Sequence, residues 1–106
     1  MLSERDGRIV LREAFEAQGY RIAEDYPLQI AGLQSAVLLD GYDANSRVGY
    51  EYLTGEDGLE PEQLEILLQQ AHCTLFLIDE TRVPDSQTLL CAVFDFFRQL
   101  EHTRCP

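Results

Sequence analysis

Residues 38–54 read LLDGYDANSRVGYEYLT and predict a β-hairpin. Two runs rich in apolar and aromatic residues flank Asp43–Ser46, and Asp, Asn and Ser are common turn residues. Each run carries one acid, Asp40 in the first and Glu51 in the second. The positions of these two carboxylates decide what the hairpin can do chemically.

The register of the hairpin determines whether the two acids share a face of the sheet. A four-residue loop at 43–46 places Tyr42 opposite Arg47. Asp40 and Glu51 then become diagonal neighbours, roughly 7 Å apart or less. A loop one residue shorter or longer moves Glu51 to the other face and mixes apolar and polar residues on both. The four-residue loop is favoured because it keeps apolar residues on one face of the sheet and polar residues on the other. Its apolar face carries Val37, Leu39, Val48, Tyr50 and Tyr52.

The hairpin lies within a chain of alternating helical and extended segments. Ser3 followed by Asp6 is typical of a helix N-cap, and Gly19 suits the position after a helix ends. Pro27 excludes a helix that runs through it, whereas Pro61 suits a first helical turn. The expected helices are about Glu4–Gln18, 61–71 and 84–102, and the expected strands are near Leu28–Ile30, about Leu33–Tyr42, Arg47–Thr54 and 74–80.

These segments give the order helix, three strands, helix, strand, helix (αβββαβα). The first three strands form an antiparallel meander. The helix at 61–71 is long enough for a right-handed crossover, so the strand at 74–80 runs parallel to the one before it. The expected fold is a single α/β (α+β) domain over residues 1–106, with a mixed sheet and helices packed on it.

The chain is strongly acidic. Nineteen Asp and Glu residues face eight Arg residues, lysine is absent, and the net charge is −11. A nucleic-acid-binding protein needs cations to displace counterions from phosphates, and an anionic membrane repels an acidic surface. We therefore expect neither nucleic acid nor membrane as a partner. A basic protein fits the charge best, with self-association as the other option.

The location follows from two further features. The start, MLSERDGRIV, carries charged residues before any apolar run, which is unlike a signal peptide. The three cysteines are odd in number and form no Cys-x-x-Cys motif, which disfavours a disulfide scaffold and suits a reducing compartment. We expect a soluble, cytoplasmic protein.

Asp40 and Glu51 suit three interpretations. In the first, they belong to a polar sheet face on which Arg47 pairs with one or both acids. In the second, they hold a divalent metal, Mg²⁺ or Mn²⁺, because one or two carboxylates commonly bind such ions. In the third, this face is an interaction surface that includes Tyr42 and Arg47.

A second group of acids is expected at one edge of the sheet. Glu56 and Asp57 follow the third strand, and Asp79 and Glu80 end the fourth. Parallel strands bring their carboxyl ends together, where α/β proteins tend to place sites. The expected interaction surface therefore comprises Tyr42, Arg47, Glu56, Asp57, Asp79 and Glu80.

The element order, with one acid on the second strand and one on the third, resembles the core of the PD-(D/E)XK nucleases, the restriction-endonuclease-like fold. The resemblance implies that Asp40 and Glu51 correspond to the two acids that bind Mg²⁺ in that family. The family's lysine, two residues after the second acid, corresponds to Leu53, and this chain has no lysine. The resemblance therefore implies a degenerate, non-catalytic member.

Two functions follow as hypotheses. The leading one is a non-catalytic protein-interaction module without a cofactor, since no complete catalytic set occurs and the charge is strongly negative. The alternative is a divalent-metal-dependent hydrolase, similar to a nuclease, in which Asp40 and Glu51 bind Mg²⁺ or Mn²⁺ and the metal activates water.

Overall fold

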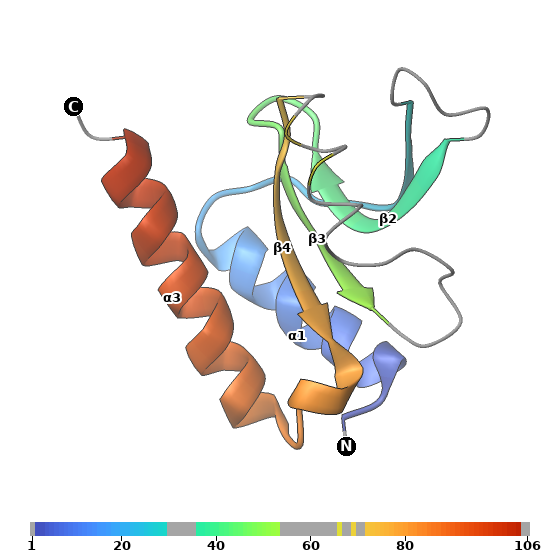
Figure 1. The fold of residues 1–106 in the computed structure, drawn as a ribbon, viewed down its shortest axis with the longest axis vertical. Helices are drawn as coiled ribbons and strands as arrows, with labels where there is room; N and C mark the ends of the chain where they lie inside the picture. Colours follow the sequence, from blue (N-terminus) through green and yellow to red (C-terminus); the bar gives the residue numbers. More distant parts are fainter. Residues whose placement is uncertain (1, 30–35, 54–65, 67–68, 70–71, 105–106) are drawn as a thin grey trace.

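The structure is a computed structural model that describes residues 2–29, 36–53, 66, 69 and 72–104. Within these residues a four-stranded sheet packs against two long helices (Figure 1). The expected helix at 61–71 lies almost wholly outside them. The elements are α1 (Glu4–Ala17), β1 (Ala23–Leu28), β2 (Val37–Asp43), β3 (Val48–Leu53), β4 (Thr74–Asp79), the 3-10 helix η1 (Glu80–Arg82) and α3 (Ser86–Arg104).

The sheet has the order β1-β2-β3-β4. The pairs β1–β2 and β2–β3 are antiparallel, and β3–β4 is parallel. The predicted mixed sheet, a three-stranded antiparallel meander with one parallel strand added, is confirmed.

Helix α1 begins and ends where its capping residues predict. The Ser3 hydroxyl accepts a hydrogen bond from the Asp6 N–H, and Gly19 adopts a φ of 96° after the C-cap residue Gln18. Gly7, within the helix, lies beneath a ring: a Cβ there would approach Cε2 of Tyr52 to 2.7 Å. The absence of a side chain at Gly7 thus lets β3 pack closely on α1.

The first strand differs from its prediction. A strand was expected near Leu28–Ile30, but β1 begins at Ala23 and contains Pro27, which lies opposite Leu38. β1 is at the edge of the sheet, and an edge strand tolerates a proline because one side of it needs no ladder hydrogen bonds. The second strand begins at Val37, and the expected turn at Ala31–Gly32 lies outside the described residues.

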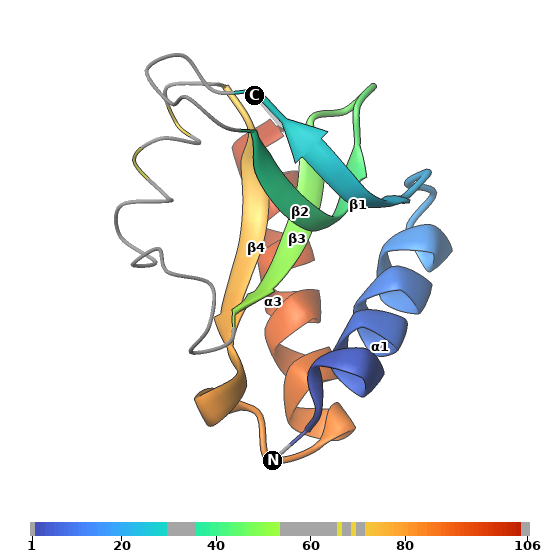
Figure 2. The ribbon, with the colours of Figure 1, turned by 90° about the vertical axis from the view of Figure 1, so that its right-hand side faces the viewer.

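Both helices cover the same face of the sheet. In Figure 2, α3 crosses behind β3 and β4, and α1 lies beside it. The core between them combines residues of all these elements, and the predicted apolar face of the hairpin contributes Val48, Tyr50 and Tyr52. Its other buried members are Leu11, Ala14, Phe15, Phe76, Val83, Leu89, Val93, Phe97 and Leu100.

A smaller apolar cluster occupies the opposite face. Leu53 is buried there and contacts Leu28, Val37, Cys73, Leu75 and Leu77. The prediction that Val37 shares a face with Val48, Tyr50 and Tyr52 is therefore wrong, because the regular pairing of β2 with β3 ends at Gly41–Tyr50. Residues of β3 therefore alternate between two apolar environments, and all six are buried. This alternation positions the hairpin acids between two packed layers.

Candidate functional site

The hairpin loop lies one residue further along the chain than the sequence predicted. Asp43 faces Val48 and Gly41 faces Tyr50, so the loop is 44–47 and the pair Tyr42–Arg47 does not form. The cause is the Asp43 side chain, whose Oδ1 accepts hydrogen bonds from the N–H groups of Asn45 and Ser46 at 2.9 and 3.4 Å. Asp43 thus ends the strand and caps the turn at once.

The two acids lie where the regular pairing of β2 with β3 ends. The paired residues run from Asp43–Val48 to Gly41–Tyr50, and Asp40 and Glu51 are the next residues on their strands, so their predicted diagonal placement stays a prediction. Both residues are 7 % exposed. A buried carboxylate is costly unless it is hydrogen-bonded or paired with a charge. The contacts of Asp40 therefore indicate whether it has a structural role or a chemical one.

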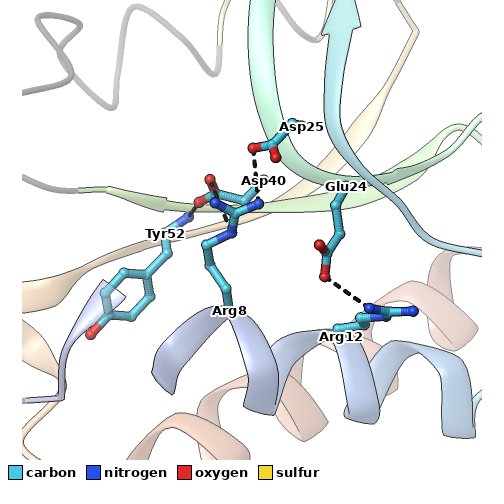
Figure 3. A network of polar contacts seen from close by, with 6 residues as sticks. All are labelled: Arg8, Arg12, Glu24, Asp25, Asp40 and Tyr52. Atoms are coloured by element: carbon cyan, nitrogen blue, oxygen red, sulfur yellow. Dashed lines mark hydrogen bonds and ion pairs between the residues drawn. The ribbon is translucent and has the colours of Figure 1, made fainter. Parts of the chain in front are cut away.

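The Asp40 carboxylate is bound from two sides (Figure 3). Its Oδ2 accepts a hydrogen bond from the backbone N–H of Tyr52 at 2.7 Å, and its Oδ1 lies 3.7 Å from Nε of Arg8 on α1. The first contact takes the place of a strand carbonyl in the β2–β3 ladder. The contact with Arg8 differs from the prediction, in which Arg47 pairs with the hairpin acids. Among the described ion pairs, Asp40 is joined to Arg8 and not to Arg47.

Arg8 joins two strands to the helix. Its Nη2 lies 2.9 Å from Oδ1 of Asp25 on β1, which follows the residue paired with Gly41. Asp25 has a φ of 51°, a region that Asp tolerates better than most residues. Burial opposes the charge of Arg8, but the carboxylates of Asp40 and Asp25 outweigh burial and raise the pKa of its guanidinium.

A second pair extends this contact toward solvent. Nη1 of Arg12 lies 3.1 Å from Oε1 of Glu24, and its Nε lies 3.3 Å from Oε1 of Glu16. Glu16 first and Glu24 second raise the pKa of Arg12. We call Arg8, Arg12, Glu24, Asp25 and Asp40 the helix–hairpin network; it borders an open pocket of about 470 Å³ between α1 and β1.

Tyr50 lies beneath the network. Its ring is fully buried, packs 4.9 Å from the ring of Phe15 and covers Gly41, where a Cβ would approach Cζ of Tyr50 to 2.3 Å. Its hydroxyl has no hydrogen-bond partner among the described residues. Burial is the main cause that raises the pKa of Tyr50, so the phenol stays neutral.

The metal hypothesis depends on Asp40 and Glu51. Two carboxylates, completed by water, can hold Mg²⁺. The described residues contain no cluster of three or more His, Cys, Asp or Glu side chains suited to a metal ion. A metal bound by the hairpin pair would also compete with Arg8 for Asp40, and the site stays a prediction.

The residues of the expected interaction surface lie in different settings. Tyr42 is 4 % exposed and its hydroxyl lies 3.2 Å from Sγ of Cys73, so it offers little surface. Arg47 is exposed in the loop with a φ of 59°. Asp79 and Glu80 lie half-buried at the end of β4, opposite the end of β3. Glu56 and Asp57 lie outside the described residues.

The sequence reasoning missed Arg8, Asp25 and Glu24. A signal was available for part of this set: Arg5, Arg8 and Arg12 are spaced along one side of α1. Their spacing of three and four residues indicated a cationic stripe that needed acidic partners from another element.

No family model, curated protein or solved structure matches this chain. In the part of the chain that the structure describes, no helix combines the length and apolar character required to cross a membrane.

Proposed function

We propose that this chain is a non-catalytic protein-interaction module that recognises a basic partner. The observation that carries the proposal is the use of the Asp40 carboxylate. It accepts a hydrogen bond from the Tyr52 N–H at 2.7 Å and lies 3.7 Å from Arg8, so the acid that the alternative hypothesis assigns to a metal ion connects β2 to β3 and to α1.

The net charge supports the nature of the partner. With a charge of −11 and no lysine, the surface attracts cationic proteins and accelerates their association at low salt. Three of the eight arginines are paired with acids in the described part of the chain: Arg8, Arg12 and Arg98. The excess of carboxylates therefore dominates the field outside the molecule.

Affinity capture tests this proposal. The chain is immobilised, a cell extract is applied at low ionic strength, and bound proteins are eluted with salt. A parallel resin that carries polyglutamate identifies proteins that bind any polyanion. We expect at least one basic protein that the chain retains and polyglutamate does not. Identical sets of proteins on the two resins would refute the proposal.

A second function, a divalent-metal-dependent hydrolase, is favoured by one observation. Asp40 and Glu51 are both buried and lie on the neighbouring strands β2 and β3, which suits two carboxylates that share an ion. Titration of the ¹⁵N-labelled chain with Mg²⁺ and Mn²⁺ tests it. Joint, saturable shifts of the Asp40, Gly41 and Glu51 amides would support a metal site, and weak shifts spread over the acidic surface would remove it.

A further inference from the structure

Strand β4 has an open edge in the described part of the chain. It pairs with β3 on one side and ends the strand order β1-β2-β3-β4. An edge strand presents backbone N–H and C=O groups with which another extended chain can pair. The direction of these groups follows from one hydrogen bond.

The Thr74 N–H donates to the Arg47 carbonyl at 2.9 Å, so the backbone groups of Thr74 point toward β3. In a parallel ladder the direction alternates from residue to residue. The N–H and C=O groups of Leu75 and Leu77 therefore point away from β3. No described strand pairs with them.

A groove lies along this edge. It has a volume of about 350 Å³ and runs between β4 and α3. Its walls combine the outward-facing strand residues with apolar and polar side chains of the helix. The lining residues are Leu75, Phe76, Leu77, Ala92, Asp95, Phe96 and Gln99.

Apolar contacts fix the floor of the groove. The rings of Phe76 and Phe96 lie 5.4 Å apart, which holds α3 against β4 beneath the groove. Ala92 is the smallest side chain on the helical wall, so the helix leaves space at this point. An apolar side chain of modest size fits there better than a polar one.

One carboxylate lines the groove, and another lies at the end of β4. Among the described residues, Asp95 is bound by exposed neighbours on its own helix, Arg98 at 3.0 Å and Gln99 at 3.3 Å. Such exposed pairs are weak, and an incoming cation can replace them. At the end of β4, hydrogen bonds from the backbone and hydroxyl of Thr81 lower the pKa of Asp79 and keep it ionised.

We propose that the groove between β4 and α3 binds an extended segment of a basic protein, which adds to the sheet as a strand beside β4. This inference rests on the proposed interaction function and names its surface and ligand. Backbone hydrogen bonds to Leu75 and Leu77 supply the pairing, an apolar side chain enters beside Ala92, and a lysine or arginine reaches Asp95. A second copy of this chain is disfavoured because it would bring another charge of −11.

The probe is a synthetic peptide of about eight alternating lysine and valine residues, a length within the range of natural strands. It is titrated into the ¹⁵N-labelled full chain. We expect saturable shifts of the amides of Leu75, Leu77 and the facing residues of α3. A glutamate–valine peptide of the same length tests the charge requirement, and a lysine–valine peptide with N-methylated backbone groups tests strand pairing. Neither should bind.

Matched variants locate the site. Asp95→Lys should weaken binding about fivefold, the upper range for one exposed ion pair. Glu13→Lys, the same charge change on the exposed side of α1, should change it by less than about twofold because salt screens distant charges. Ala92→Phe should fill the groove and abolish binding, whereas Ala17→Phe at the exposed end of α1 should not.

Four results would overturn the inference: shifts that map to another surface, equal binding of the N-methylated peptide, no binding of the lysine–valine peptide, or a dimeric chain whose β4 amides shift on dilution. The first three leave the interaction function standing if affinity capture has found a specific partner. Failure of the capture experiment removes the interaction function itself, so the two failures are distinguishable.

Discussion

Replacement of Asp40 tests whether this acid is structural. Asp40→Ala removes the acceptor of the Tyr52 N–H and one neighbour of Arg8. A hydrogen bond to a buried charged group contributes about 1.5–3 kcal/mol, and the 3.7 Å pair with Arg8, which is 24 % exposed, adds less than about 1 kcal/mol. We expect Asp40→Ala to lower the free energy of unfolding by about 2–4 kcal/mol.

Two conservative variants separate these contributions. Asp40→Asn keeps an oxygen for the Tyr52 N–H and loses the charge, so we expect a loss of about 1–2 kcal/mol. Asp25→Asn makes the same change at the other partner of Arg8. Its side chain is 60 % exposed and Asn tolerates the φ of 51°, so the expected loss is below about 1 kcal/mol.

Urea unfolding monitored by circular dichroism measures these differences as shifts of the midpoint at constant slope. The result that would refute the reasoning is an Asp40→Ala variant as stable as the parent or more stable. Residues kept for function commonly reduce stability, and their replacement raises it. Such a result would favour the metal-dependent hydrolase over the interaction module.

Three further predictions concern the same hairpin. Gly41→Ala should lower the free energy of unfolding by about 1–3 kcal/mol, because its Cβ would approach the Tyr50 ring to 2.3 Å; an unchanged thermal midpoint would contradict this. Tyr50→Phe should be neutral or stabilising by up to about 1 kcal/mol, because the hydroxyl has no partner among the described residues; a clear loss in urea unfolding would reveal one. For Asp43, burial alone would raise its pKa, but N–H donors led by Arg21 lower it below 3.8. Its stabilisation is present above the unfolded value and disappears as the pH falls through the folded one, so Asp43→Asn should destabilise the chain at neutral pH and match the parent in acid. A constant difference across a pH series of unfolding curves would disprove that assignment.

The apolar face of β3 could be predicted because side chains alternate along a strand, but the prediction for β2 was wrong at Val37, which packs with Leu53 in the other cluster. Val48, Tyr50 and Tyr52 were expected together and lie in one core. The turn lies one residue further along the chain than predicted, at 44–47 instead of 43–46. The composition of residues 43–46 indicated a turn. It did not reveal that the Asp43 carboxylate would accept hydrogen bonds from the N–H groups of Asn45 and Ser46.

The ion-pair partner of Asp40 could not be predicted from the residues near it in the sequence. Arg47 was the nearest cation in the chain, but it lies in the loop with a φ of 59° and is exposed. Arg8 reaches Asp40 because α1 packs on β2 and β3, a contact between segments far apart in sequence. Hydrophobic patterns predict that a helix covers the sheet, but they do not fix which residues of the helix lie above a given strand.

The packing of α1 against α3 has a consequence for how the chain folds. Leu11 and Phe15 of the first helix lie in the same core as Val93 and Phe97 of the last, and the Leu2 N–H donates to the Val83 carbonyl at 2.8 Å. During synthesis the apolar side of α1 emerges from the ribosome well before the helix that covers it. Contacts of such long sequence separation form late and slow the search for the native state. The nascent chain therefore completes its core only after α3 has been made, and until then it carries exposed apolar surface that a chaperone would recognise.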